Sequence, residues 1–380
     1  MKKRIYLDNN ATSKLRPFVK AAAMQAMDIC GNASSIHIDG QNARKLIENA
    51  RKVIVAALGT LSSELIFTSG ATEAAQLALE SAKSMGFDVV FVGAAEHPAI
   101  MAYAKQIFTN VNVIPMDTVG NIDLVWLDTR LAEAQALGQK PFVAIQAANN
   151  ELGIINPLSK ISGIAKNYGA ALLVDAVQAF GKMPPQDYAS FADWLIVSPH
   201  KVGGPLGVGA LLLAPGIDGA RNRPGGGQEK GQRSGTQNLP AIHGFGAIAD
   251  VAADTAGFMA QTGALRDKFE TELLSNWPDA VIFGKNTNRL TNTTCFAIAG
   301  WSAEHMVIAL DLAGISISSG SACSSGSVKS SATLLALQAP TDLAKCAVRI
   351  SFGWNSEAHE PAAAITAMLA ADERRKQIAA

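Results

Sequence analysis

The sequence lacks the charge imbalance that marks nucleic-acid-binding and membrane-surface proteins. Its 32 basic residues balance its 32 acidic residues, so the formal net charge at pH 7 is zero. Neither nucleic acid nor an anionic membrane is therefore indicated as the main partner. Only 17% of the 380 residues are charged, whereas 48% are hydrophobic. A globular chain of this length can form one large domain and a smaller one, and we expect a small-molecule ligand.

Cysteine is also scarce. The four cysteines, Cys30, Cys295, Cys323 and Cys346, show no CxxC spacing. We therefore expect neither a metal site nor a disulfide framework, and a reducing cytoplasm fits best. The basic N-terminus is followed by no apolar signal-peptide core, and no apolar run approaches the length that crosses a membrane. The sequence thus favours a cytoplasmic protein.

The order of elements predicts an α/β fold. Strand and helix patterns alternate over residues 60–215, which is typical of a doubly wound, mostly parallel sheet. We place the large domain at residues 12–255 and a smaller α+β domain at residues 1–11 and 256–380. Three local expectations are an antiparallel edge strand at 208–214, one alanine-rich helix over 247–274, and one strand at 315–320.

Two apolar runs end in residues that suit one ligand. AALLVDA places Asp175 at the end of one strand, and ADWLIVSPHK ends the next in Ser198, His200 and Lys201. Ligands of open α/β sheets gather at the carboxyl ends of the strands, so Asp175 and Lys201 are expected to approach one ligand. A partly desolvated lysine can form a Schiff base, and an aspartate suits a protonated ring nitrogen, as around pyridoxal 5'-phosphate (PLP). Taken alone, Lys201 could equally be a surface lysine.

Other strands also end in polar residues. The turn SGAT at residues 69–72 would let backbone N–H groups approach a phosphate, although many such turns are glycine-rich for geometry only. His97 follows the next strand, where a structural role and a functional one are equally open, and Asn150 follows another. The glycine- and arginine-rich loop at residues 221–238 is too long for a tight turn, which favours a functional role.

The most unusual thiol is Cys323, which lies among serines and glycines, whereas Cys295 lies in the apolar run TTCFAIAG. An exposed thiol of this kind is a candidate nucleophile, while buried cysteines are usually inert. Arg349, in the strand VRISFG, is either exposed at a sheet edge or holds a substrate carboxylate in a bidentate pair.

Together these segments resemble the cysteine desulfurases of the NifS/IscS type, within the fold-type I, class V aminotransferase family. The resemblance covers nearly the whole chain and implies a PLP-dependent transferase that forms a homodimer. Its motifs occur in the family's order with similar spacing: YLDNNAT, GNASSIH, TSGATE, EHPAI, NNELG, VDAVQ, SPHK, GGGQEKGQRSGT, SSGSACSSG and VRISFG.

The resemblance implies a role for each matching residue around the ring of PLP. Lys201 would bind PLP covalently, and Asp175 would pair with the ring nitrogen. Gln178 would hydrogen-bond the ring oxygen, and His97 would stack on the ring and could move protons.

The phosphate of PLP would be bound by a separate set of residues. The backbone of Ala71 and Thr72 would contact it, together with the side chains of Thr72, Ser198 and His200. Thr236 would reach it from the second subunit of the homodimer.

The same resemblance implies the reaction. Asn150, which would also contact PLP, and Arg349 would orient the carboxylate of L-cysteine. The Cys323 thiolate would attack the substrate sulfur to form a persulfide, and L-alanine would be released. The flexible loop would then deliver the sulfur to an acceptor protein, for iron–sulfur cluster assembly or tRNA thiolation. Neither nucleic acid nor a membrane is a direct partner in this scheme.

The sequence also leaves other functions open. A selenocysteine lyase could share the exposed Cys323, whereas a class V aminotransferase that acts on another amino acid has no use for it. A non-catalytic interaction protein would not require Lys201, Asp175 and Arg349 together. A nicotinamide-dependent dehydrogenase would need a GxGxxG turn after its first strand, which the sequence lacks.

Overall fold

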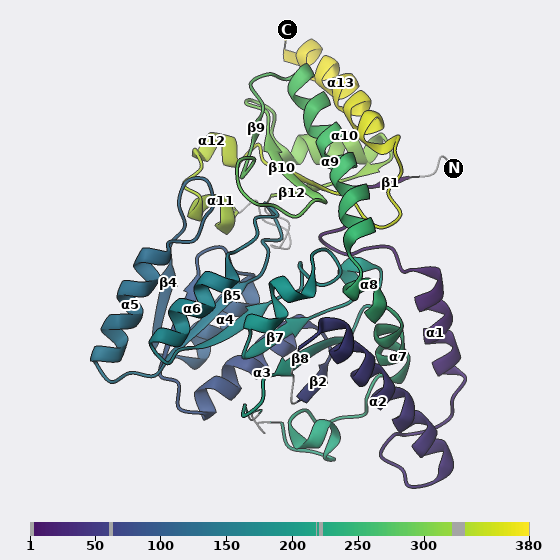
Figure 1. Cartoon of the computed structure of the whole chain (residues 1–380). Helices are drawn as coiled ribbons and strands as arrows, with labels where there is room; N and C mark the ends of the chain where they lie inside the picture. Colours follow the sequence, from purple (N-terminus) through teal and green to yellow (C-terminus); the bar gives the residue numbers. More distant parts are fainter. Residues whose placement is uncertain (1–3, 61–63, 218, 220–222, 321–330, 380) are drawn as a thin grey trace.

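The computed structural model describes residues 4–60, 64–217, 219, 223–320 and 331–379, so Cys323 lies outside the described residues. A broad lower part is built on a large sheet, and a narrower upper part carries the C-terminal helix (Figure 1). Among the described helices, none has both the length and the apolar character needed to span a bilayer.

A seven-stranded sheet forms the centre of the lower part. Five adjacent strands, β7, β6, β5, β3 and β4, are parallel to one another, whereas β8 is antiparallel to both of its neighbours, β2 and β7. The prediction of a doubly wound, mostly parallel sheet is confirmed. In spatial order the strands are β2 (Glu64–Thr68), β8 (Gly209–Leu213), β7 (Trp194–Val197), β6 (Ala171–Asp175), β5 (Pro141–Gln146), β3 (Val89–Gly93) and β4 (Asn110–Ile114).

Helices cover both faces of this sheet. Along β7, Trp194 and Ile196 pack into one core, whereas Leu195 and Val197 pack into the other, because successive side chains of a strand point to opposite faces. One face is covered by α3 (Ala71–Ser84) and α4 (Pro98–Ile107). The other is covered by α1 (Pro17–Met27), α2 (Ile38–Leu58), α5 (Leu124–Ala136), α6 (Leu158–Asn167), α7 (Leu239–Ala247) and α8 (Ala249–Ala253).

The upper part combines a four-stranded antiparallel sheet with helices and joins the two ends of the chain. β1 (Ile5–Tyr6) pairs in parallel with β11 (Ile315–Ser316). This pairing supports the predicted grouping of residues 1–11 with 256–380, which remains a proposal. The sheet has the order β12 (Ser318–Ser319), β13 (Val348–Ser351), β10 (Thr293–Ala297) and β9 (Val281–Ile282). The helices are α9 (Ala256–Asn276), α10 (Ala303–Leu312), α11 (Ala332–Ala336), α12 (Thr341–Ala344) and α13 (Glu360–Ala379).

Three local predictions are wrong. β8 is antiparallel as predicted but lies between β2 and β7, because its unbroken apolar run is buried on both faces and suits the interior of a sheet. The region 247–274 is divided between the end of α7, all of α8 and most of α9, and the break between α8 and α9 lies where the chain is extended at Asp254. The strand at 315–320 divides into β11 and β12, which join different sheets on either side of the buried Ile317.

Candidate active site

The carboxyl ends of the parallel strands meet around one cavity of about 460 Å³. His97 comes from the segment after β3, Asn150 from the segment after β5, Asp175 from the end of β6 and Lys201 from the segment after β7. Parallel strands present their carboxyl ends at one edge of the sheet, which explains why residues so distant in sequence meet here. The volume lies in the range of small-molecule and cofactor sites.

Most of the predicted site residues line this cavity. Thr236 is exposed and does not line it, and Cys323 lies outside the described residues, so the roles of both remain predictions. The predicted residues that the cavity brings together are Ala71, Thr72, His97, Asn150, Asp175, Gln178, Ser198, His200, Lys201 and Arg349.

Both described flanks of the Cys323 segment lie beside residues of the cavity. Ser318 pairs with Arg349 in the antiparallel ladder of β12 and β13. On the other flank, the hydroxyl of Ser331 donates to the carboxylate of Glu151, which follows Asn150 in the chain. The two described flanks of this segment therefore contact Arg349 on one side and Glu151, the neighbour of Asn150 in the chain, on the other.

The N-terminus of α3 is a candidate anion site at the cavity. The first N–H groups of a helix have no partner within it, and here Ala71 and Thr72 supply them beside the Thr72 hydroxyl. β8 runs very close to this turn, since a Cβ atom on Gly209 would lie 2.7 Å from the carbonyl carbon of Gly70. Glycine at position 209 therefore allows β8 to pack directly against the backbone of this turn.

Two residues after β7 add polar groups to the same cavity. The Ser198 hydroxyl donates to the backbone oxygen of Val208 at 3.1 Å, and His200 Nδ1 lies 3.3 Å from Thr12 Oγ1. Burial, together with the positive charges of Lys201 and Lys182, lowers the pKa of His200 to about 4. The ring is therefore neutral at pH 7 and can donate only one N–H group.

The His97 ring is fixed by the helix that it begins. Its Nδ1 accepts a hydrogen bond from the backbone N–H of Ala99 at 3.2 Å and caps α4, so the proton of the neutral ring is on Nε2. Burial lowers the pKa of His97. The negative charge of Asp175 opposes this effect, and the positive charge of Lys201 adds to it.

Arg349 is held from two sides and still has N–H groups to offer. Nη2 donates to Asp8 Oδ1 at 2.6 Å, and Nη1 donates to the backbone oxygen of Asn150 at 2.9 Å. Its Nε is buried and has no hydrogen-bond partner within the described part of the chain. A buried N–H group without a partner costs free energy, so a ligand oxygen is expected there.

Sequence reasoning missed three residues that complete the site, namely Asp8, Asn10 and Lys182. Asp8 holds Arg349, and Asn10 Nδ2 donates to the backbone oxygen of Asn150 at 3.1 Å. The signal for the first two was present, because DNNAT is a polar run directly after a short strand. Nothing around Lys182 in the sequence distinguishes it from a surface lysine.

Glu73 ties the anion site to the loop that carries Thr236. Its carboxylate accepts from Ser69 N at 2.6 Å, pairs with Arg233 at 3.1 Å and contacts Arg223. Burial would raise the pKa of Glu73, but the hydrogen bonds from Arg233 and Ser69 prevail and lower it to about 2. The carboxylate therefore stays ionised and joins the first turn of α3 to this loop.

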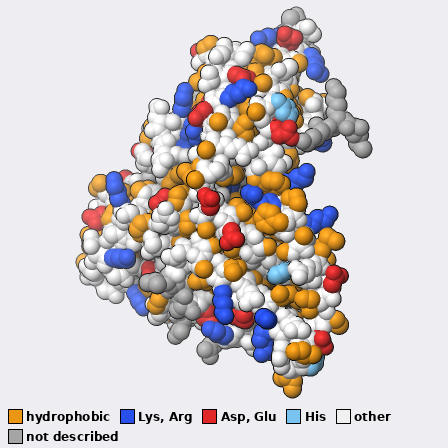
Figure 2. Space-filling view, turned by 45° about the vertical axis from the view of Figure 1, so that its right-hand side comes forward, with side chains coloured by type: hydrophobic (Ala, Val, Ile, Leu, Met, Phe, Trp, Pro, Cys, Tyr) orange, Lys and Arg blue, Asp and Glu red, His pale blue; other side chains and the backbone are white. Residues whose placement is uncertain are grey.

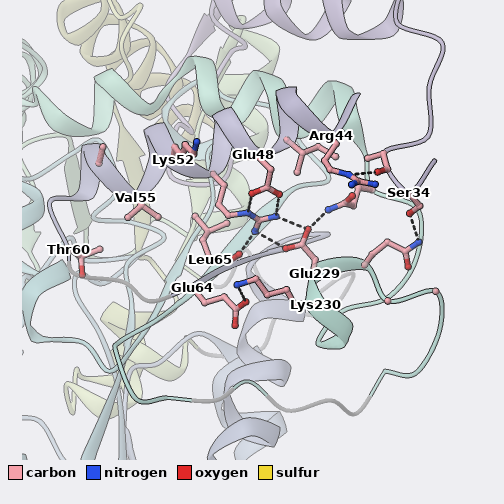
Figure 3. A pocket seen from close by; sticks show the side chains of 18 of the residues that line it. Ser34, Arg44, Glu48, Lys52, Val55, Thr60, Glu64, Leu65, Glu229 and Lys230 are labelled. Atoms are coloured by element: carbon pink, nitrogen blue, oxygen red, sulfur yellow. Dashed lines mark hydrogen bonds and ion pairs between the residues drawn. The ribbon is translucent and has the colours of Figure 1, made fainter. Parts of the chain in front are cut away.

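A second cavity, of about 710 Å³, lies between α2 and the same loop (Figure 3). Arg51 Nη1 donates to Glu229 Oε2 at 2.9 Å, and that oxygen also accepts from Phe67 N at 3.1 Å. The Arg51 guanidinium forms ion pairs with both Glu48 and Glu229, two residues that are labelled in Figure 3. This buried pair anchors the loop to α2 and β2.

The residues of the first cavity fit PLP. Helix N–H groups and hydroxyls suit its phosphate, the Asp175 carboxylate suits its ring nitrogen, and the Lys201 amine suits its aldehyde. The unpartnered Nε of Arg349 would remain for the carboxylate of an amino-acid substrate. Within the described residues, no group of His, Cys, Asp and Glu side chains could hold a metal ion.

The chain is similar to known proteins over nearly its whole length. A family model, aminotransferase class-V, matches residues 5–360. A protein named cysteine desulfurase from Nostoc sp. is 38% identical over 359 residues, covering 91% of this chain and 87% of the relative. The structure of a NifS-like protein from Rickettsia africae has a TM-score of 0.88 at 33% identity, covering 97% and 99%. A structure of SspA in complex with cysteine has a TM-score of 0.75 at 26% identity, covering 92% and 98%.

Proposed function

The chain belongs to the class V aminotransferase family, and we propose from this membership that it is a PLP-dependent cysteine desulfurase of fold type I. It converts L-cysteine to L-alanine and transfers the sulfur to Cys323. The observation that carries the proposal is that one cavity brings together Lys201, Asp175 and Arg349. These residues suit the aldehyde of PLP, its ring nitrogen and the substrate carboxylate.

Each residue around PLP would have a separate role in the reaction. Bound PLP would draw electrons away from the α-carbon of the amino acid. Lys201 Nζ would bind PLP covalently and would accept the α-proton of the substrate. Asp175 would keep the ring nitrogen protonated, and His97 would contact the ring as a neutral imidazole. The phosphate would be bound by Ala71, Thr72, Ser198 and His200.

The sulfur transfer would involve the substrate-binding residues and Cys323. Arg349 and Asn150 would orient the carboxylate of L-cysteine. The Cys323 thiolate would attack the substrate sulfur, so that an S–S bond forms as the C–S bond breaks and the substrate carbon gains a proton. The positions of Ser318 and Ser331 beside the cavity support this role. The persulfide would then pass its sulfur to an acceptor protein, for iron–sulfur clusters or thiolated tRNA.

A homodimer would complete the site. Thr236 is exposed and lies outside the cavity of its own chain, so it is free to contact PLP in a second copy. Hydrophobic side chains gather on the lower part of the face shown in Figure 2, and a second copy would cover such a patch. Exposed apolar residues of α1, α2 and the segment between them include Phe18, Met24, Met27, Ile36 and Ile38.

The cytoplasm is the proposed location of this activity. Cys30, Cys295 and Cys346, the three cysteines among the described residues, form no disulfide. The reaction also requires a reduced thiol at Cys323, which a reducing compartment would maintain.

The test is the visible absorption spectrum of the purified protein before and after L-cysteine is added with a reductant, while sulfide and alanine are assayed. We expect a PLP band that changes with L-cysteine, and equal amounts of both products. A PLP band without sulfide release would indicate that another amino acid, such as selenocysteine, is the substrate. A colourless protein that cannot be reconstituted with PLP would overturn it.

A further inference from the structure

A buried lysine lies beside the cavity without a role in the chemistry proposed above. Lys182 is in the turn after β6, and only 1% of its surface is exposed. Its Nζ donates to Gln178 Oε1 at 2.6 Å and to Asn10 Oδ1 at 2.8 Å. Within the described residues it forms no ion pair. Lysines are rarely buried without a charged partner, so its position requires an explanation.

The surroundings of Lys182 agree with these contacts. Burial lowers the pKa of Lys182 well below its usual range, and the positive charges of Lys201 and Arg349 lower it further. The amine can donate only while a proton lies on each of its hydrogen bonds, and the oxygens of Gln178 and Asn10 accept from it. The buried amine is therefore satisfied as a donor without a carboxylate.

The contacts of Gln178 leave only one orientation for its amide. Nε2 donates to the backbone oxygen of Asn10 at 3.0 Å, and that oxygen can only accept, while Oε1 accepts from Lys182. If the amide were turned over, Oε1 would face the carbonyl oxygen of Asn10 and Nε2 would face the N–H groups of Lys182. The backbone oxygen of Asn10 accepts one N–H group of Gln178 Nε2. The second N–H group of Nε2 therefore remains for a ligand in the cavity that Gln178 lines.

Asn10 is itself fixed by the small domain. Its Oδ1 also accepts from Asn292 Nδ2 at 3.0 Å, and its Nδ2 donates to Thr293 Oγ1 at 2.8 Å. Lys182 thus joins Gln178 to a buried network that is held from both parts of the molecule. Such a network resists rotation of any single member, because each lost contact leaves a buried polar atom unpaired.

We propose that Lys182 is a positioning residue for PLP. By holding Oε1 of Gln178, it turns the N–H group of that amide toward the ring oxygen of the cofactor. The inference rests on the proposed function, since it assumes that PLP occupies the cavity. Lys182 itself does not contact PLP in this scheme and acts through Gln178.

The test compares five full-length variants, Lys182→Gln among them, each freed of PLP and then titrated with it. Lys182→Met removes both N–H donors, Gln178→Met removes the amide, and the double variant combines them. Lys160→Met, on the exposed face of α6, is the matched control. The readouts are the Kd for PLP, the pH at which the visible band of bound PLP changes, and the unfolding temperature of the protein without PLP.

We expect Lys182→Met to weaken PLP binding by about tenfold, the worth of one well-placed hydrogen bond. The pH midpoint of the visible band should also move, because the ring oxygen loses its donor. Gln178→Met should show both changes, the double variant should be no worse than Gln178→Met, and Lys160→Met should match the wild type. Lys182→Gln keeps N–H donors and should recover part of the loss.

Two results would overturn the inference. One is a folded Lys182→Met protein whose Kd and pH midpoint match those of the wild type. The other is a double variant whose losses in binding add, because Lys182 would then act independently of Gln178. If Lys182→Met does not fold, Lys182→Gln replaces it in the same comparison. A wild type that binds no PLP would refute the proposed function itself.

Discussion

Arg349 donates from Nη2 to Asp8 Oδ1 at 2.6 Å, so a carboxylate of the N-terminal segment holds the arginine proposed to bind the substrate. Only 4% of the Arg349 side chain is exposed. A buried guanidinium paired on one side keeps a fixed plane, and the substrate carboxylate must bind to the N–H groups that remain. Asp8 should therefore control how well L-cysteine binds, although it would not contact the substrate.

The first prediction concerns Asp8. Asp8→Asn should raise the KM for L-cysteine by about tenfold and change kcat little, because one charge-assisted hydrogen bond to Arg349 is lost. Steady-state kinetics measure this, with the exposed Asp279→Asn as control. Arg349→Lys should be worse, since lysine cannot form a bidentate pair. A fall in kcat at unchanged KM in Asp8→Asn would argue for a different role.

The second prediction concerns Lys201. Lys201→Ala should bind PLP only reversibly, because the amine that would form the covalent bond is absent. After denaturation and desalting, the wild type treated with borohydride should retain the cofactor absorption and the variant should not. Lys160→Ala should behave like the wild type. Cofactor that stays attached to Lys201→Ala would assign the covalent bond to another residue.

The third prediction separates Cys323 from Cys30, the exposed cysteine among the described residues. Cys323→Ser should keep the PLP spectrum but release neither sulfide nor alanine from L-cysteine, because the sulfur has no acceptor. Cys30 is exposed and does not line the cavity, so Cys30→Ser is the control and should keep full activity. Sulfide release by the Cys323 variant at the wild-type rate would remove the persulfide step from the proposal.

The fourth prediction concerns pH. The folded protein lowers the pKa of His200 from 6.5 to about 4, so between these pH values the unfolded chain binds more protons than the folded one. Stability should therefore fall as the pH falls through this window, by up to about 3 kcal/mol from this residue. Urea unfolding at several pH values and fixed protein concentration measures it. His200→Asn should show a shallower fall, and a slope equal to that of the wild type would show that His200 is not its source.

The fifth prediction compares two ion pairs of different burial. Only 1% of the Glu229 side chain is exposed, whereas Glu133 pairs with Arg130 on the surface. Glu229→Ala should lower the free energy of unfolding by about 3 kcal/mol or more, because it leaves Arg51 without its buried partner. Glu133→Ala should cost less than about 1 kcal/mol. Equal losses in urea unfolding would show that Glu229 does not anchor the loop.

The sequence predicted those parts of the fold and site that depend on local pattern. Asp175 and Lys201 end apolar runs, and parallel pairing of such runs brings their ends together. The position of β8 could not be predicted in this way, because an apolar strand has the same sequence pattern whether it pairs with one neighbouring strand or with two. Which strand lies at an edge is decided by pairing between distant segments.

Lys182 and Asp8 escaped prediction for a related reason. Their roles depend on Gln178 and Arg349, and for Asp8 the partner lies at the opposite end of the chain. Asp8 begins a polar run after Leu7, and Lys182 lies between Gly181 and Met183, and charged residues in such turns usually face solvent. Burial of a charged group becomes visible only when the surrounding elements are placed in space.

The pairing of the N-terminal segment has a consequence for the order of synthesis. Ile5 pairs with Ile315, and Asn9 donates from its backbone to Ser351 at 3.2 Å, so this segment has partners that are synthesised more than 300 residues later. The last strand of the seven-stranded sheet along the chain ends at Leu213, so the sheet can form on a nascent chain before Arg349, the partner of Asp8, has been synthesised. The cavity can therefore reach its final form only after residue 351 has left the ribosome, and a chain stalled before that point would carry the large sheet without the partners of its N-terminal segment.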